Sequence, residues 1–162
     1  MNIFILDENI DECCKFHCDS HSVKQVLESH QMLSTAHRVI DTDKIFEERS
    51  IYKATHINHP CSIWVRKTKG NYLWMRDFTM RLSIEFSYRY GKIHRSFEQV
   101  FPMLLEPPKN IDQSMERTPF AQAMPDEYKD EDAVTAYRNY YIGEKNHLFY
   151  WNKRATPYWI NQ

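Results

Sequence analysis

Five polar residues that can bind anions or transfer protons recur along one predicted helix. They are His17, His21, Lys24, Glu28 and Gln31, and their spacing of 4, 3, 4 and 3 places them on one helical stripe. Lys24 with a histidine can bind an anion, and Glu28 can carry a proton or accept a ligand hydroxyl. The alternative is a solvated row of ion pairs, which usually contains lysine, glutamate and arginine. We predict Glu28, Lys24 and His21 as catalytic residues and His17 as a ligand contact.

The same stripe offers the beginning of a metal site, because His17 and His21 lie one turn apart with Cys18 between them. Zinc sites need three or four protein ligands. No His-Glu-x-x-His or Cys-x-x-Cys pattern completes such a set, and neither a P-loop nor a Rossmann glycine fingerprint occurs. We therefore predict no metal and no cofactor.

Two further segments in the middle of the chain suit a phosphate or a base. Asn58-His59-Pro60 is typical of a helix start, where free N–H groups attract anions, and Arg66 follows within the first turns. Tyr88–His94 interleaves aromatic and basic residues, as in surfaces that stack bases and bind phosphates. The predicted ligand contacts in these segments are Asn58, His59, Arg66 and Arg89. Helix capping is the alternative role of Asn58.

The C-terminal third adds a second group of side chains that can read a base edge or stack on it. Tyr137, Tyr141 and Lys145 share one helical stripe, and core packing is the alternative role of the two tyrosines. The predicted ligand contacts in this part are Gln122, Asp126, Tyr128, Tyr137, Arg138, Tyr141 and Lys145.

The elements that position these side chains are predicted to be helical and to form a single domain of 162 residues. Only three glycines occur, and few apolar runs alternate, which argues against an all-β fold. We predict a mainly α domain of about five helices with a short N-terminal strand or extended arm. The arm is Asn2–Leu6, and the helices are Asp11–His17, Ser20–Val39, Pro60–Tyr90 with a bend near Gly70, Ser96–Leu105 and Glu131–Trp151 capped by Asp130.

Two details of this prediction concern packing. Val23, Val26, Leu33 and other residues at three-and-four spacing predict the core-facing stripe of the second helix. Four prolines between Glu106 and Lys129 predict a long irregular segment, and its apolar stretch is expected to lie against the body of the domain.

Charge and cysteine content narrow the class of protein. The net charge of -1 lacks the basic excess of a non-specific DNA binder, so a nucleic-acid role needs a local cluster, or the ligand is a small nucleotide. The four cysteines show no secreted spacing, and we predict free thiols in a reducing cytosol. No stretch reaches the ~20 apolar residues of a membrane span. The prediction is a cytoplasmic protein without a membrane partner.

The sequence from Cys18 to Leu33, with Asn58-His59-Pro60 and Trp64, resembles a family of short phage proteins. These share a His-Cys-Asp-x-His-x-x-Lys helix, an Asn-His-Pro-x-x-x-Trp helix start and an Ala-Met-Pro-Asp-Glu-Tyr segment, and the resemblance spans almost the whole chain. More distantly, the Lys-Gln-x-x-Glu-x-x-Gln-x-Leu pattern that begins at Lys24, together with Asn58-His59-Pro60, is similar to bacterial relatives of the pyrimidine-dimer DNA glycosylase (endonuclease V) family, and this resemblance covers roughly residues 1 to 90.

The distant resemblance implies a small helical fold and a specific reaction. In that family an amine attacks the sugar carbon of a damaged nucleotide, an early-helix carboxylate assists, and a Schiff base permits strand cleavage. Carried over, Glu28 or Asp19 is the carboxylate and Lys24 the candidate amine. The family enzyme of phage uses the amine freed when methionine is removed; the matching position in this chain is Asn2, before which methionine removal is not expected.

Three functional hypotheses follow from the sequence. The first is a DNA glycosylase or lyase acting on damaged pyrimidines, favoured by the resemblance. The second is a phage protein that sequesters or cleaves a host immune-signalling nucleotide. It fits the near-neutral charge and predicts a pocket at an interface between copies of the chain. The third is an interaction module whose aromatic excess, 14% of the residues, forms a partner surface.

Overall fold

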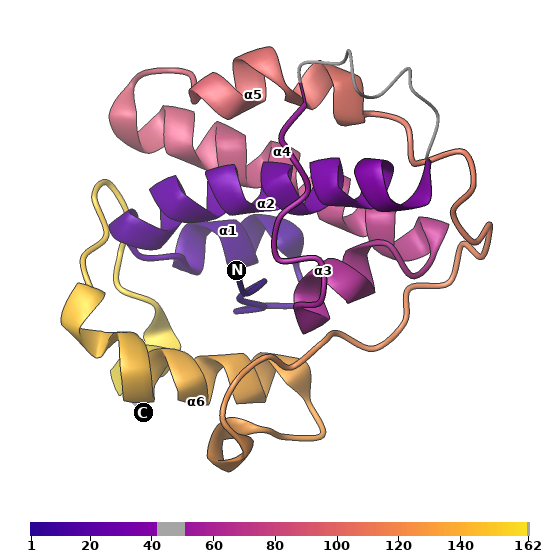
Figure 1. The fold of residues 1–162 in the computed structure, drawn as a ribbon. Coiled ribbons are helices and arrows are strands. Elements are labelled where there is room, and N and C mark those ends of the chain that lie inside the picture. The colour runs from indigo at the N-terminus through magenta and orange to yellow at the C-terminus, as the bar shows by residue number, and fades with distance from the viewer. Residues whose placement is uncertain (42–50, 162) are drawn as a thin grey trace.

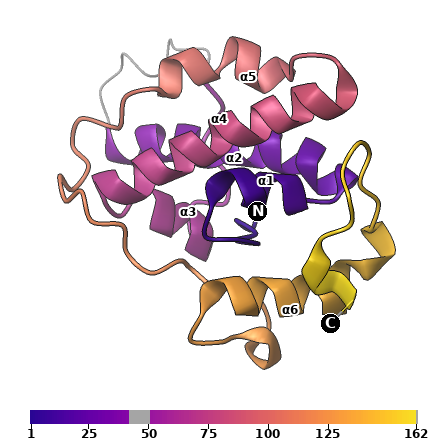
Figure 2. The same ribbon diagram turned by 180° about the vertical axis from the view of Figure 1, so that it is seen from behind.

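Two helices of 22 residues each form the centre of the fold, α2 (Asp19–Ile40) and α4 (Lys69–Tyr90). They pack against each other, and α1 (Ile10–Phe16) packs against α4. The helix α5 (Arg95–Gln99) lies along one side of this pair, and α6 (Ala133–Lys145) lies on the opposite side (Figure 1). The N-terminus lies between them, in the middle of the molecule (Figures 1 and 2).

The structure is a computed structural model and describes residues 1–41 and 51–161. The described residues contain six α-helices and no strand, which confirms the prediction of a mainly helical fold. The remaining elements are α3 (Pro60–Val65) and the short 3-10 helices Phe101–Leu104, Asp126–Tyr128, Asn146–Leu148 and Tyr158–Asn161. In this part of the chain, none of the helices has the length and apolar character required to cross a membrane.

Three helices differ from the prediction in where they begin, divide or end. The helix predicted from Pro60 to Tyr90 is two helices, because the Thr68 hydroxyl caps Asn71 N and begins a new helix, α4. The last helix is capped by Asp132 instead of Asp130, and ends at Lys145. The predicted helix Ser96–Leu105 divides into α5 and a 3-10 turn at a buried Val100.

The first six residues form an extended arm, one of the two conformations that the sequence predicts for this segment. Ile3, Phe4, Ile5 and Leu6 are all buried. The Arg138 guanidinium from α6 donates to Leu6 O at 2.9 Å, so the arm is fixed to both α6 and the core. This insertion brings the first residue of the chain beside α2.

The segment 106–125, which we call the strap, crosses from α5 to α6 over the start of α4 (Figure 1). Its carbonyls accept the N–H groups of Lys69 and Gly70 at 2.8 and 2.9 Å. A Cβ at Gly70 would lie 2.4 Å from Met115 O, so this close approach requires glycine. Phe120 packs on two tryptophans, which confirms that the apolar part of the strap lies against the body.

The core-facing stripe of α2 is only partly as predicted. Val26, Leu33 and Ala36 are buried, but Val23 is 39% exposed. Phe78, Leu82 and other large side chains of α4 belong to the same hydrophobic core.

Candidate functional site

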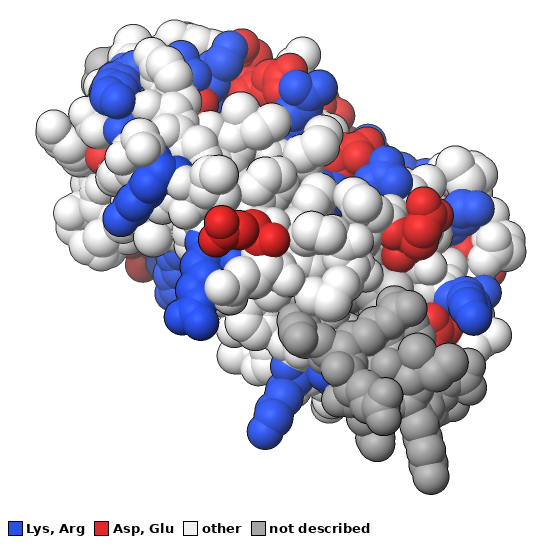
Figure 3. Space-filling model, turned by 90° about the horizontal axis from the view of Figure 1, so that it is seen from above, with Lys and Arg blue, Asp and Glu red and all other residues white. Residues whose placement is uncertain are grey.

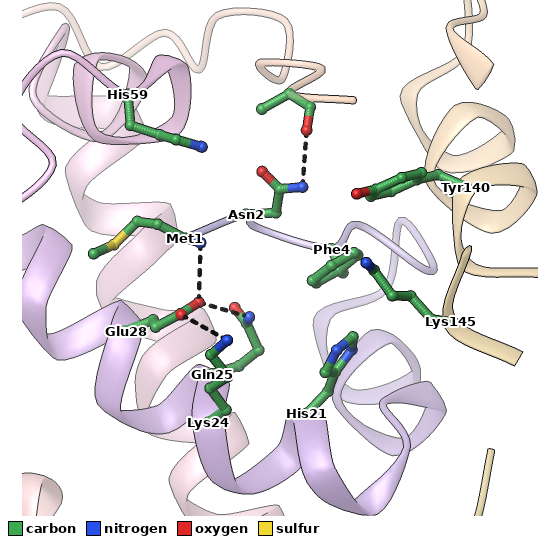
Figure 4. A pocket seen from close by; sticks show the side chains of 11 residues that line it. Met1, Asn2, Phe4, His21, Lys24, Gln25, Glu28, His59, Tyr140 and Lys145 are labelled. Carbon is green, nitrogen blue, oxygen red and sulfur yellow. Dashed lines mark hydrogen bonds and ion pairs between the residues drawn. The ribbon is translucent and has the colours of Figure 1, made fainter. Parts of the chain in front are cut away.

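A polar pocket of about 310 Å³ opens where the N-terminal arm meets α2 and α6 (Figure 4). It collects side chains from five separate parts of the chain: the arm, α2, the cap of α3, the strap and α6. Its lining is formed by Met1, Asn2, Phe4, His21, Lys24, Gln25, Glu28, His59, Ala123, Tyr140 and Lys145. The volume is at the lower end of the range of small-molecule sites.

The arm places the chain's α-amine inside this pocket. Met1 N lies 3.4 Å from Glu28 Oε2, and the methionine side chain is 3% exposed. Asn2 holds the arm from the other side, because its side-chain amide donates to Ala123 O at 2.8 Å. The amine is therefore anchored by burial of the residues that follow it and by the strap.

Glu28 is the centre of a small charge network. Besides the amine, its Oε2 accepts a hydrogen bond from Gln25 Nε2 at 2.9 Å. Lys24 Nζ approaches the other carboxylate oxygen at 3.6 Å, and its side chain is 66% exposed while that of Glu28 is 11% exposed. One buried carboxylate thus pairs with the α-amine and an exposed lysine, an arrangement suited to moving a proton at an amine.

The remaining walls supply a cation and aromatic rings. Lys145 Nζ lies 5.0 Å from the centre of the Tyr140 ring. Phe4 stacks between the rings of His21, at 4.7 Å, and Tyr140, at 6.1 Å. The pocket lining contains three cationic groups, the α-amine, Lys24 and Lys145, and one carboxylate, Glu28. The pocket therefore attracts an anion although the net charge of the whole chain is -1.

Both histidines of the pocket are neutral at pH 7. Burial lowers the pKa of His21 to about 3, and the nearby His17, Lys145 and Lys24 act in the same direction. Its Nδ1 lies 2.9 Å from the Tyr141 hydroxyl. Burial also lowers the pKa of His59, together with the neighbouring α-amine. Neither ring contributes charge to the binding of an anion.

The structure brings His21, Lys24 and Glu28 together on the pocket wall, as their spacing predicts, and it adds two of the predicted ligand contacts, His59 and Lys145. Their roles stay predictions. His17 ends α1 and precedes α2, which begins at Asp19, so it is not part of the helical stripe that the sequence predicts; it is fully buried, with Nδ1 2.8 Å from Cys13 O. Its predicted contact with a ligand does not fit this position, because its ring packs against Phe4 and Phe78 and does not line the pocket.

Arg89 also lies away from the pocket. Its side chain is 0% exposed and pairs with Glu85 and Asp19 at 2.7 and 3.0 Å. It further donates to the carbonyls of His17 and Lys15. These bonds tie α4 to the start of α2, and complete burial keeps the guanidinium from the ligand contact that the sequence predicts.

The two tyrosines of α6 take the alternative role that the sequence left open. Tyr137 is buried and donates to Ala121 O at 2.7 Å. Tyr141 is buried and its hydroxyl accepts Cys18 N at 2.9 Å. The residue between them, Tyr140, faces the pocket instead, because it lies at the edge of the same helical stripe.

Other predicted contacts serve the loops that hold them. The guanidinium of Arg66 donates to Ile57 O at 2.7 Å, and Asn58 is exposed while His59 caps α3. In the C-terminal third, Gln122 bonds the backbone of Asp130, and Arg138 binds Asp7 and Leu6 O.

Asp126 and Tyr128 likewise bond within their own segment and α6. Asp126 pairs with Lys129 at 2.6 Å, and the Tyr128 hydroxyl donates to Glu144 at 3.0 Å. Neither lines the pocket, which takes only Ala123 from this stretch.

Sequence reasoning missed Met1, Gln25 and Tyr140. The apolar residues 3–6 could have indicated a role for Met1. If these residues are buried, the α-amine that precedes them must lie close to the core. Gln25 could have been found from spacing, because it lies four residues after His21 and three before Glu28 on the same helix. Tyr140 has no such signal, because tyrosines also occupy positions 137 and 141 of that helix.

No cluster of three or more histidine, cysteine or acidic side chains that could hold a metal occurs among residues 1–41 and 51–161. The four cysteines are free and buried. Burial raises the pKa of Cys13 to about 12 and that of Cys14 well above its ordinary value, so neither thiol is a nucleophile near neutral pH.

Fold and pocket together define a helical domain whose buried arm presents an α-amine to a carboxylate in an open polar pocket. Comparison of the chain with protein-family models, with curated proteins and with solved structures finds no match.

Three buried histidines predict a loss of stability in mild acid. Burial lowers the pKa of His17 and His30 to about 4 and that of His21 to about 3, from 6.5. Below about pH 6.5 the unfolded chain binds up to three more protons than the folded one, so stability decreases as the pH falls toward 4. The slope approaches about 4 kcal/mol per pH unit.

Urea unfolding followed by tryptophan fluorescence at pH 7, 6 and 5 measures this slope. His30→Gln should reduce it by about 1.4 kcal/mol per pH unit, the contribution of one proton. The exposed His56→Gln should leave it unchanged. Equal stability of the wild type at pH 7 and pH 5 would contradict the expectation.

Proposed function

We propose that the chain is a DNA glycosylase and lyase that acts on damaged pyrimidines through a Schiff base formed by the α-amine of Met1. The observation that carries this proposal is the 3.4 Å approach of that amine to Glu28 inside an open pocket. An amine beside a carboxylate is the pairing that such a reaction needs, and it agrees with the reaction implied by the sequence resemblance. The proposed setting is the cytoplasm of a phage-infected cell.

The α-amine is a better nucleophile than Lys24 in this pocket. Amines attack only in the deprotonated form, and Glu28 Oε2 can accept a proton from Met1 N at 3.4 Å. Met1 is also the better anchored of the two, because its side chain is 3% exposed whereas that of Lys24 is 66% exposed. Lys24 therefore changes role from the sequence-based candidate amine to a cation that binds phosphate.

The reaction begins with attack of the amine nitrogen on C1′ of the damaged nucleotide. The new N–C1′ bond forms as the bond from C1′ to the base breaks, and the base leaves with the bonding electrons and takes a proton from water. Glu28 accepts a proton from the attached nitrogen. The nitrogen lone pair then opens the C1′–O4′ bond to give the Schiff base, from which loss of a C2′ proton eliminates the 3′ phosphate.

Local charge supports a nucleic-acid substrate in a chain with no overall basic excess. Lys24 and Lys145 flank the amine, and each can contact a phosphate. On the face shown in Figure 3, the described basic and acidic side chains are interspersed, without an extended basic patch. Binding is therefore expected to rest on few phosphate contacts and to show a shallow dependence on salt.

Borohydride trapping tests the proposal. Wild-type protein is incubated with duplex DNA that carries an abasic site or ultraviolet-damaged thymines, and borohydride reduces any Schiff base to a stable protein–DNA adduct. We expect an adduct whose crosslinked peptide contains Met1. Absence of an adduct with both substrates would end the proposal.

Two variants identify the amine. Adding Gly-Ser ahead of Met1 moves the α-amine by up to ~7 Å and should abolish the adduct. Lys24→Met should retain it, with weaker DNA binding. The reverse pattern would assign the chemistry to Lys24 and remove Met1 from the mechanism.

The second candidate is a protein that binds a small nucleotide, favoured by the pocket volume of about 310 Å³, which is within the range of small-molecule sites. The rings of Phe4 and Tyr140 would contact the base, and Lys24 and Lys145 the phosphates. Incubation with cyclic dinucleotides or ADP-ribose derivatives, followed by heat release, tests this function. Intact released ligand indicates sequestration, altered ligand indicates an enzyme, and absence of depletion rejects the idea.

A further inference from the structure

The imidazole of His59 is held in one tautomer, and the reaction steps above give this residue no role. It is the N-cap of α3, and its Nδ1 accepts the backbone N–H of Cys61 at 3.2 Å. A backbone N–H can only donate, so Nδ1 must carry the lone pair. In a neutral imidazole the proton is then on Nε2. The cap determines the tautomer.

The protonated nitrogen belongs to the pocket. His59 lines the same cavity as the α-amine, and Figure 4 shows its ring extending from the start of α3 toward Met1 and Asn2. The α-amine, His56 and Glu28 are the charged or titratable groups that act on it. Burial and the first two of these lower the pKa of His59, so the ring stays a neutral donor at pH 7.

We propose that His59 is a catalytic residue that donates its Nε2–H to the sugar ring oxygen O4′ while the C1′–O4′ bond opens. This inference rests on the proposed glycosylase and lyase function. The electron pair of the breaking bond goes to O4′, which becomes an alkoxide and then takes a proton from water. His59 keeps its own proton and stabilises the negative charge through the hydrogen bond.

A neutral imidazole suits this step better than a charged one. An imidazolium beside the α-amine would repel the amine's own positive charge and the iminium that forms from it. A neutral donor stabilises the oxygen without that penalty, and removal of one such donor typically slows catalysis by about 10²–10³-fold.

His59→Asn tests the role while keeping the helix start intact. Asparagine is a favourable N-cap, so its side chain can accept the same backbone N–H. It has no second N–H at the position of Nε2. We expect kcat for cleavage of an abasic-site duplex to fall by about 100-fold, with KM changed by less than about threefold and an unaltered shape of the pH profile.

The chain provides a matched control. His94 caps α5 in the same way, with Nδ1 accepting Ser96 N at 3.2 Å, and it does not line the pocket. His94→Asn makes the same substitution at the same structural position and should leave kcat and KM unchanged. An equal loss in both variants would mean that the effect comes from capping, and would overturn the proposal.

Further outcomes also decide the question. Unchanged kcat in His59→Asn, or a change in KM alone, overturns the catalytic role. Nitrogen NMR of the wild-type histidines gives an independent readout: a proton on Nε2 of His59 at pH 7 supports the proposal, and one on Nδ1 refutes it even if the variant does not fold. Failure of the wild type to form any adduct would instead reject the proposed function, and this inference with it.

Discussion

Glu28→Gln is expected to slow formation of the borohydride-trapped adduct by about 10²–10⁴-fold while the fold persists. Glutamine keeps the size of the side chain and can still accept the hydrogen bond that Gln25 donates at 2.9 Å. It cannot take a proton from the amine, and it removes the negative charge that holds Met1 N at 3.4 Å. The magnitude is that of a lost general base in other enzymes.

Single-turnover trapping on an abasic-site duplex, with circular dichroism as a check of folding, measures this effect. Glu12→Gln is the matched control, because Glu12 also pairs with a lysine of its own helix but is 45% exposed and does not line the pocket. A trapping rate within about threefold of the wild type in Glu28→Gln would show that the carboxylate takes no part in the proton transfer.

Arg89→Met is expected to destabilise the fold by about 3–5 kcal/mol, the cost of breaking a buried ion pair by removing one partner. Methionine fills much of the volume, so the loss is one of charge and hydrogen bonds. Burial alone would raise the pKa of Glu85, but hydrogen bonds from Arg154 and Arg89 outweigh it and hold that pKa below its usual value. Removing Arg89 takes this donor from the carbonyls of His17 and Lys15 and leaves Asp19 with the backbone N–H of Asn152.

Arg81→Met on the same helix provides the comparison. Arg81 approaches Asp11 at 3.5 Å, and both side chains are about half exposed, at 49% and 55%. Exposed pairs of this kind contribute about 0–1 kcal/mol. Chemical denaturation of both variants should therefore separate them by at least about 2 kcal/mol. Similar midpoints would mean that the buried network is dispensable.

The sequence predicts the helices well where their signals are local. Gly91 ends α4 in the left-handed conformation, with φ of 67°, and the polar stripe on α2 indicates a site because its members are one turn apart. The sequence predicts helix boundaries poorly where contacts with a segment distant in the chain determine them. Thr68 becomes a helix start because the strap docks on it, with Glu116 O accepting its hydroxyl at 3.1 Å.

The candidate site shows the same division. His21, Lys24 and Glu28 can be recognised from their spacing alone. The position of Met1 in the pocket depends instead on how the buried N-terminal arm packs in three dimensions. Arg89 was mistaken for a ligand contact because an arginine between two tyrosines has the same pattern on a surface and in a buried network. Only its partners, Glu85 and Asp19, distinguish the two, and Asp19 is 70 residues away in sequence.

The docking of the strap has a consequence for anion binding at the start of α4. Helix starts attract phosphate because their first amide protons lack acceptors. At α4 those protons already point at carbonyl oxygens of residues 112 and 114, and no side chain larger than hydrogen fits at Gly70 to separate the two backbones. The positive end of the α4 dipole, near Arg66 and Lys67, is therefore already paired with carbonyl oxygens of the same chain. This leaves the pocket at the N-terminus of the chain as the more favourable site for an anionic ligand.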